Sequence, residues 1–142
     1  MTALAFRKGS DTLLGSLIRL RTGSIYSHVE LVLDGGIDQV STCFSASWMD
    51  DGVRTRKIRL AGDNWDVVPV HLNLNRVADL QRSEDGKPYD RMGILTWGTP
   101  FASLQDKDRW FCSELAAEAL RYGKPWTESP ASLAADLTGV WR

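Results

Sequence analysis

The chain has 142 residues, and its 17 Lys and Arg residues stand against 18 Asp and Glu residues, which gives a formal charge of −1 with His neutral. This balance excludes a dedicated nucleic-acid-binding protein, because such proteins follow phosphates with clustered cations. With 43% hydrophobic and 25% charged residues the composition is that of an ordinary soluble domain, and we expect one domain over residues 1–142.

Neither membrane insertion nor metal binding is expected. No segment approaches the roughly 20 apolar residues of a membrane-spanning helix, and the first residues lack the layout of a signal peptide, so we expect a cytoplasmic protein without membrane contact. Cys43 and Cys112 are too few for a disulfide scaffold, and His28 and His71 are too few for a zinc-type cluster. Each cysteine is therefore a candidate free thiol, and no metal or cofactor is expected.

The first half of the chain predicts one helix and then a series of strands. Residues 11–21 carry Leu and Ile at helical spacing, with Ser10 as the candidate N-cap and an end near Gly23. The hairpin signal Asp34-Gly35-Gly36 closes the first strand. Because short turns join the strands, we expect an antiparallel meander within a sheet of about four to six strands. The strands are expected at residues 26–33, 39–45, 53–58 and 65–72.

The second half of the chain predicts helices. Apolar residues recur there at helical spacing, and Gly123 and Pro125 are the expected stop of the longest helix. The order helix, strands, helices predicts an α+β fold. The helices are expected at residues 76–82, 89–96, 110–122 and 130–137.

Cys112 is the residue that most directly indicates chemistry, because it follows two aromatic residues at the start of a predicted helix. The unpaired N–H groups and the dipole at a helix N-terminus favour anions, so they activate a thiol and can bind an oxyanion. The alternative is a small core residue, which is what a lone cysteine commonly is. Cys43 is expected to be such a buried residue.

His28 is the preferred imidazole partner for the thiol. It lies in the apolar strand 26–33, where alternation puts it on the same face as Glu30. The alternative is a core histidine whose ring is hydrogen-bonded, since an unpaired ring would be costly there. His71 lies at the end of a strand and is expected to face solvent.

Three segments follow one another in a distinctive order: Ser27-His28-Val29 on a strand, Gly86-Lys87-Pro88-Tyr89-Asp90, and Phe111-Cys112-Ser113-Glu114-Leu115 opening a helix. Together they resemble the circularly permuted NlpC-type branch of the papain-like fold, in which the histidine strand precedes the cysteine helix. Such a permutation is compatible with catalysis because only the spatial arrangement matters. The segment Asp51-Gly52-Val53-Arg54 is also similar to small members of the family from bacteriophage and prophage genomes.

The resemblance implies a papain-like fold and a cysteine hydrolase of the peptidase or amidase type. Cys112 would attack an acyl carbon to form a thioester, and His28 would take up the thiol proton and then protonate the leaving group. The implied substrate is an amide bond, with peptidoglycan peptides as the leading class. Without a signal peptide, such a cell wall hydrolase would reach its substrate through phage-linked release or association with a virion.

The third member of the site stays open between two residues. The family generally orients its histidine with a polar side chain from the following strand, and Ser45 lies nearest to that place. A serine hydroxyl stabilises an imidazolium less than a carboxylate does, and Glu30 competes for the same role. The remaining candidates for substrate binding or orientation are Tyr89, Ser113 and Trp48.

Two other functions stay open. The family branch includes lipid acyltransferases, and a thiol acyltransferase or esterase would use the same residues, although the chain has no long apolar insertion or anchoring tail. A non-catalytic structural or binding module, such as a virion component, is favoured if neither Ser45 nor Glu30 reaches the imidazole.

Overall fold

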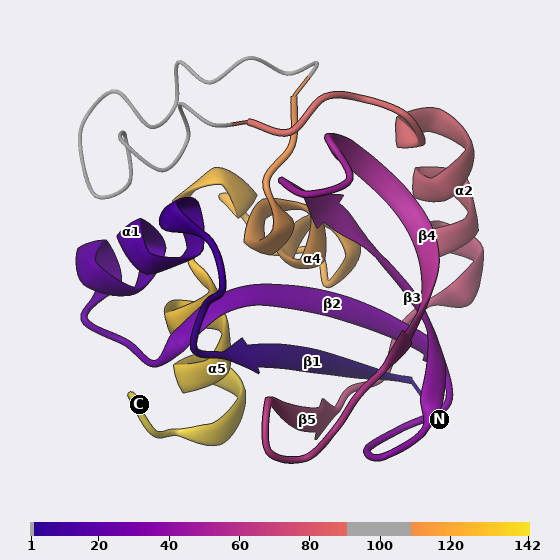
Figure 1. Ribbon diagram of the computed structural model, residues 1–142. Helices are drawn as coiled ribbons and strands as arrows, with labels where there is room; N and C mark the ends of the chain where they lie inside the picture. Colours follow the sequence, from indigo (N-terminus) through magenta and orange to yellow (C-terminus); the bar gives the residue numbers. More distant parts are fainter. Residues whose placement is uncertain (1, 91–108) are drawn as a thin grey trace.

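The computed structural model describes residues 2–90 and 109–142. Five strands form one antiparallel sheet, and four α-helices of the described residues accompany it (Figure 1). The α+β class expected from the sequence is thus confirmed. In chain order the elements are β1 (Ala3–Lys8), α1 (Leu13–Thr22), β2 (Tyr26–Asp34), β3 (Val40–Ser47), β4 (Gly52–Arg59), β5 (Trp65–Pro69), α2 (Leu74–Glu84), α4 (Cys112–Ala119), a 3-10 turn (Pro125–Thr127) and α5 (Pro130–Thr138).

The strand order is β4-β3-β2-β1-β5, with every pair antiparallel. The meander β2-β3-β4 follows the prediction, including the hairpin after β2. The fourth predicted strand is present as β5, but the prediction that it extends the meander beyond β4 is wrong, because β5 pairs with β1. β1 itself has no counterpart among the predicted strands: its residues 3–6 are completely buried on both faces, so they lack the alternation that marks a strand.

The two faces of the sheet carry different residues. One face carries Phe6, Val29 and Leu31, which form the main core with Leu115 of α4. Figure 1 shows α4 beside β2, in agreement with its contacts to β2 and β3. The opposite face carries a smaller apolar cluster, and His28 and Glu30 belong to this face by the alternation of β2. The members of the smaller cluster are Ala3, Ala5, Val32, Cys43, Leu60 and Trp65.

The helix ends differ from the sequence prediction in detail. The N-cap of α1 is Thr12, not Ser10: the Thr12 hydroxyl accepts from the Gly15 N–H (3.0 Å), whereas the Ser10 hydroxyl donates to the Thr12 carbonyl (2.9 Å). Most of the predicted helix 89–96 lies outside the described residues. Its first residue, Tyr89, forms an isolated parallel β-bridge with Trp110. Within residues 2–90 and 109–142, none of the helices has the length and hydrophobicity that crossing a bilayer requires.

A β-bulge lies in β2 immediately before His28. The β1–β2 register pairs Arg7 with His28 and Lys8 with Tyr26, so Ser27 is the extra residue. The Ser27 hydroxyl is held by the Gly9 carbonyl (2.6 Å). Bulges bend a strand and change the direction of the neighbouring side chains. The bulge at Ser27 therefore affects the direction of the neighbouring His28 side chain.

Candidate active site

Cys112 is the first residue of α4. Its N-cap, Phe111, has an extended backbone and supplies no side-chain cap, and the first intrahelical bond runs from the Leu115 N–H to the Phe111 carbonyl (3.1 Å). Helix geometry therefore leaves the N–H groups of residues 112–114 without intrahelical acceptors, beside the thiol. Cys112 is only 1% exposed. The thiol thus lies at the positive end of a helix dipole and largely away from water.

The structure brings the Cys112 thiol together with two polar side chains from distant parts of the chain. An interaction with Cys112 raises the pKa of both the His28 imidazole and the Tyr89 hydroxyl. His71, the other histidine, is exposed to solvent. The late thiol and the early imidazole that the sequence analysis pairs therefore lie near one another, where α4 packs against β2.

The carboxylate of Glu30 fixes the imidazole of His28. His28 Nε2 lies 2.7 Å from Glu30 Oε1, which leaves Nδ1 as the ring nitrogen that can serve the thiol. The Trp65 ring packs edge-on against the imidazole, with 6.4 Å between the ring centroids. The His28 side chain is 21% exposed and that of Glu30 only 1%. Glu30 and Trp65 therefore hold the imidazole ring in place, while part of the His28 side chain stays exposed to solvent.

The protonation of His28 follows from these neighbours. Burial alone lowers the pKa of His28, but the negative charges of Cys112 and Glu30 and the hydrogen bonds to both residues outweigh it and raise this pKa to about 10. Burial alone raises the pKa of Glu30, but the positive charge of His28 and the hydrogen bonds from Arg54 and His28 hold it below its ordinary value. The site therefore favours an imidazolium beside a carboxylate.

Arg54 of β4 holds Glu30 in place. Its Nη1 donates to Glu30 Oε2 (2.8 Å) and its Nη2 to Oε1 (2.6 Å), and its Nε donates to Asp50 Oδ2 (2.7 Å). This contact crosses β3, because Arg54 pairs with Ser45 and the register of Leu31 with Phe44 places Glu30 opposite Ser45. A short side chain at Ser45 leaves space for the guanidinium. We call the resulting set of contacting side chains the polar chain; its members are Cys112, His28, Glu30, Arg54 and Asp50.

The Ser45 hydroxyl, which the sequence analysis places nearest to the orienting position, binds the backbone and not His28. This hydroxyl donates to the Val29 carbonyl (2.7 Å), so its proton serves the backbone, and Glu30 rather than Ser45 occupies His28 Nε2. The physical reason is reach, since a serine side chain ends close to its own strand. Ser113 is likewise used structurally: it is buried, and its hydroxyl donates to the Glu128 carbonyl (2.7 Å).

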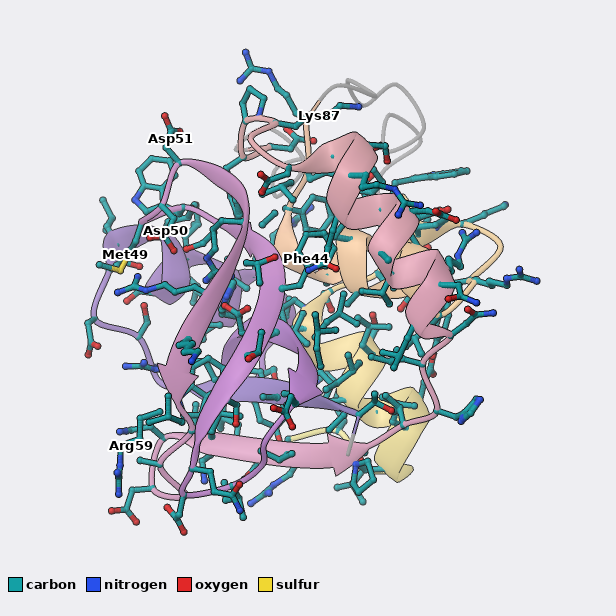
Figure 2. All side chains as sticks on the ribbon, turned by 90° about the vertical axis from the view of Figure 1, so that its right-hand side faces the viewer. Phe44, Met49, Asp50, Asp51, Arg59 and Lys87 are labelled. Carbon is teal, nitrogen blue, oxygen red and sulfur yellow. The ribbon has the colours of Figure 1, made fainter. Side chains whose placement is uncertain are left out.

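A cleft of about 370 Å³ opens above His28 and Glu30. Its walls are α1 on one side and the β3–β4 hairpin on the other; Met49 and Asp50 mark the turn of this hairpin and Arg59 its far end (Figure 2). Trp48 is half-buried and packs edge-on against Tyr89, with the ring centroids 6.4 Å apart. Both aromatic residues line the cleft.

Arg54 and Asp50 are site residues that the sequence analysis does not single out. A signal for them exists in β4, where alternation puts Arg54 on the same face as its partner Ser45, hence on the face of Glu30. An arginine on a half-buried face needs an acid nearby. Cys43, by contrast, is completely buried as expected, and burial raises the pKa of its thiol to about 12.

Comparison of the sequence with protein-family models and with curated proteins gave no match. A functional interpretation of this chain therefore depends on its own residues and their geometry.

Proposed function

We propose that the protein is a cysteine hydrolase that cleaves an amide bond through a thioester, with Cys112 as the nucleophile and His28 as the general acid and base. The observation that carries the proposal is the Cys112 thiol at a helix N-terminus, which interacts with the His28 imidazole. The buried carboxylate of Glu30 fixes Nε2 of that imidazole. A nucleophile, a base and an orienting group in this order are the components of thiol-dependent acyl transfer.

The acylation step uses the groups in sequence. In the resting site the proton of the Cys112 thiol already lies on His28, so Sγ attacks the carbonyl carbon of the substrate as a thiolate, and the π electrons of the carbonyl move to the oxygen. The N–H groups in the first turn of α4 face this developing oxyanion and stabilise it. When the carbonyl re-forms, the C–N bond breaks, and the imidazolium gives its proton to the departing amine.

Deacylation reverses these roles. A water molecule gives a proton to His28 and attacks the thioester carbon, and the C–S bond breaks to leave the Cys112 thiolate beside the His28 imidazolium. The products are a carboxylic acid and the free enzyme. Glu30 stays ionised throughout and stabilises the positive charge on His28 in both steps.

The fold we propose is papain-like of the permuted NlpC type. The support is the chain order, with the histidine strand β2 before the cysteine helix α4, and the packing of that helix on an antiparallel sheet. Peptidoglycan peptides are the proposed substrate class, in a cytoplasmic protein whose access to the cell wall is phage-linked. The support for this class is the resemblance around His28 and Cys112.

The first alternative differs from the proposed hydrolase in its substrate, and the second differs in having no catalytic activity. A lipid acyltransferase or esterase would use the same three side chains and differ in the acyl donor. The best support for a non-catalytic module is a site in which neither Ser45 nor Glu30 reaches the imidazole. The 2.7 Å contact of Glu30 with His28 removes that support.

Thiol alkylation tests the proposal without a substrate. At pH 7 we expect iodoacetamide to modify Cys112 at least about 100-fold faster than Cys43, because the His28 contact activates the first thiol and burial suppresses ionisation of the second. His28→Asn should slow the Cys112 reaction by about tenfold or more. Mass spectrometry of the digested protein gives both rates. Cys43→Ser is the matched control and should leave the fast reaction intact; equally slow labelling of both thiols would refute the proposal.

A further inference from the structure

Among the residues that the structure describes, the acids that line the cleft are all engaged by cations. Asp11 pairs with Arg7 (2.7 Å), and Glu30 pairs with Arg54. Asp50 pairs with Arg54 and also with Arg56 (2.7 and 3.1 Å). None of these carboxylates is left to attract a cation or to balance further positive charge in the cleft.

The β4 side of the cleft carries positive charge beyond these pairs. Arg56 is 61% exposed, and among the described residues its guanidinium has a single acceptor, Asp50, which it shares with Arg54. Lys57 and Arg59 also line the cleft, are exposed, and have no ion-pair partner within residues 2–90 and 109–142. Figure 2 shows Arg59 at the end of β4 remote from the Asp50 turn. We call Arg56, Lys57 and Arg59 the basic wall.

We propose that the cleft selects an acyl donor that carries a carboxylate, and that Arg56 and Arg59 of the basic wall bind it. This inference rests on the proposed function, because it concerns the substrate of the same site. Guanidinium groups present paired N–H donors that match the two oxygens of a carboxylate. An acidic peptide fits better than a lipid surface, because the cations line a concave cleft of about 370 Å³ together with Trp48 and Tyr89.

Two alkylating reagents of nearly equal size test the basic wall directly. Iodoacetate carries a carboxylate and iodoacetamide its neutral counterpart, so the ratio of their rates at Cys112 reports the preference for an anion. Relative to the same ratio for free glutathione, we expect about a threefold to tenfold preference for iodoacetate at low salt, and its loss at about 1 M salt. The combined variant Arg56→Gln, Arg59→Gln should lower this ratio severalfold and leave the iodoacetamide rate nearly unchanged.

The matched control is Arg82→Gln, which removes an exposed arginine of α2 that pairs with Asp79 outside the cleft. It should leave the ratio unchanged. If both reagents label Cys112 rapidly and the double variant keeps the wild-type ratio, the carboxylate proposal is overturned while the hydrolase proposal stands. If neither reagent labels Cys112 faster than Cys43, the hydrolase proposal itself fails, and the carboxylate proposal fails with it.

Protection experiments identify the source of the anion. N-acetylglutamate should slow the iodoacetamide reaction of Cys112 more than N-acetylglutamine does, and this difference should vanish in the Arg56→Gln, Arg59→Gln variant. Sedimentation with phosphatidylglycerol vesicles tests the alternative that the arginines bind an anionic lipid surface. Binding to these vesicles that requires both arginines, with no difference between the two protecting compounds, would overturn the acidic peptide in favour of an anionic lipid surface.

Discussion

Cys112→Ala should reduce the rate of amide hydrolysis by about 10⁴-fold or more, because a thioester pathway has no substitute for its nucleophile. The assay is the release of free amino groups from purified peptidoglycan peptides. Since the substitution removes one buried sulfur atom next to the unaltered His28, we expect the far-ultraviolet circular dichroism of the variant to match that of the wild type. The loss would then be chemical and not a result of unfolding.

Cys43→Ala is the matched control for this experiment. Cys43 is as deeply buried as Cys112 and lies in the smaller apolar cluster of the other sheet face. Its replacement should cost stability but leave the hydrolysis rate of the folded protein within about twofold of the wild type. A Cys112→Ala protein that hydrolyses peptides at the wild-type rate would show that Cys112 is not the nucleophile.

Arg54→Met should lower the free energy of unfolding by about 3–5 kcal/mol, because it leaves the carboxylate of Glu30 buried with one cationic partner removed. The same variant should also impair alkylation of Cys112, since Glu30 no longer has a fixed position from which to orient His28. Urea denaturation gives the stability, and the labelling rate at low denaturant gives the effect on the site. Arg54→Lys should restore only part of both, because an ammonium group cannot bind both carboxylate oxygens at once.

Arg56→Met provides the contrast. Arg56 lies two residues further along the same strand and binds the same Asp50, but it is mostly exposed. Its loss should change the free energy of unfolding by less than about 1 kcal/mol. If Arg54→Met were equally mild, the polar chain would have no structural importance, and Glu30 would not depend on Arg54.

Local periodicity is sufficient to predict part of this site. A period of two along residues 26–33 places His28 and Glu30 on one face, and β2 has that arrangement, because backbone geometry fixes the alternation. The helix start near Cys112 is likewise local: two aromatic residues precede it, and α4 begins at the cysteine itself. The sequence therefore supplies the candidates for nucleophile, base and carboxylate, although it leaves Glu30 and Ser45 as rivals.

The contacts between strands require information that local pattern lacks. Arg54 reaches Glu30 only because the registers of β2 with β3 and of β3 with β4 put both residues opposite Ser45, and a shift of one residue would turn the side chains to the other face. The position of β5 beside β1 is a long-range pairing of the same kind, since strands that follow each other in sequence are neighbours only as a tendency. The β-bulge at Ser27 also depends on pairing with β1.

The titration of the His28 imidazole in wild type and in Cys112→Ala tests the central claim most directly. Nitrogen-15 NMR follows the ring through the pH range, and His71→Gln assigns the two histidine signals. The pKa of His28 is raised to about 10, so we expect the wild-type ring to be protonated at neutral pH. The charge of Cys112 is the largest of the contributions that raise this pKa. In Cys112→Ala the titration midpoint of His28 should therefore fall by about one unit or more. An identical midpoint in both proteins would mean that thiol and imidazole do not interact.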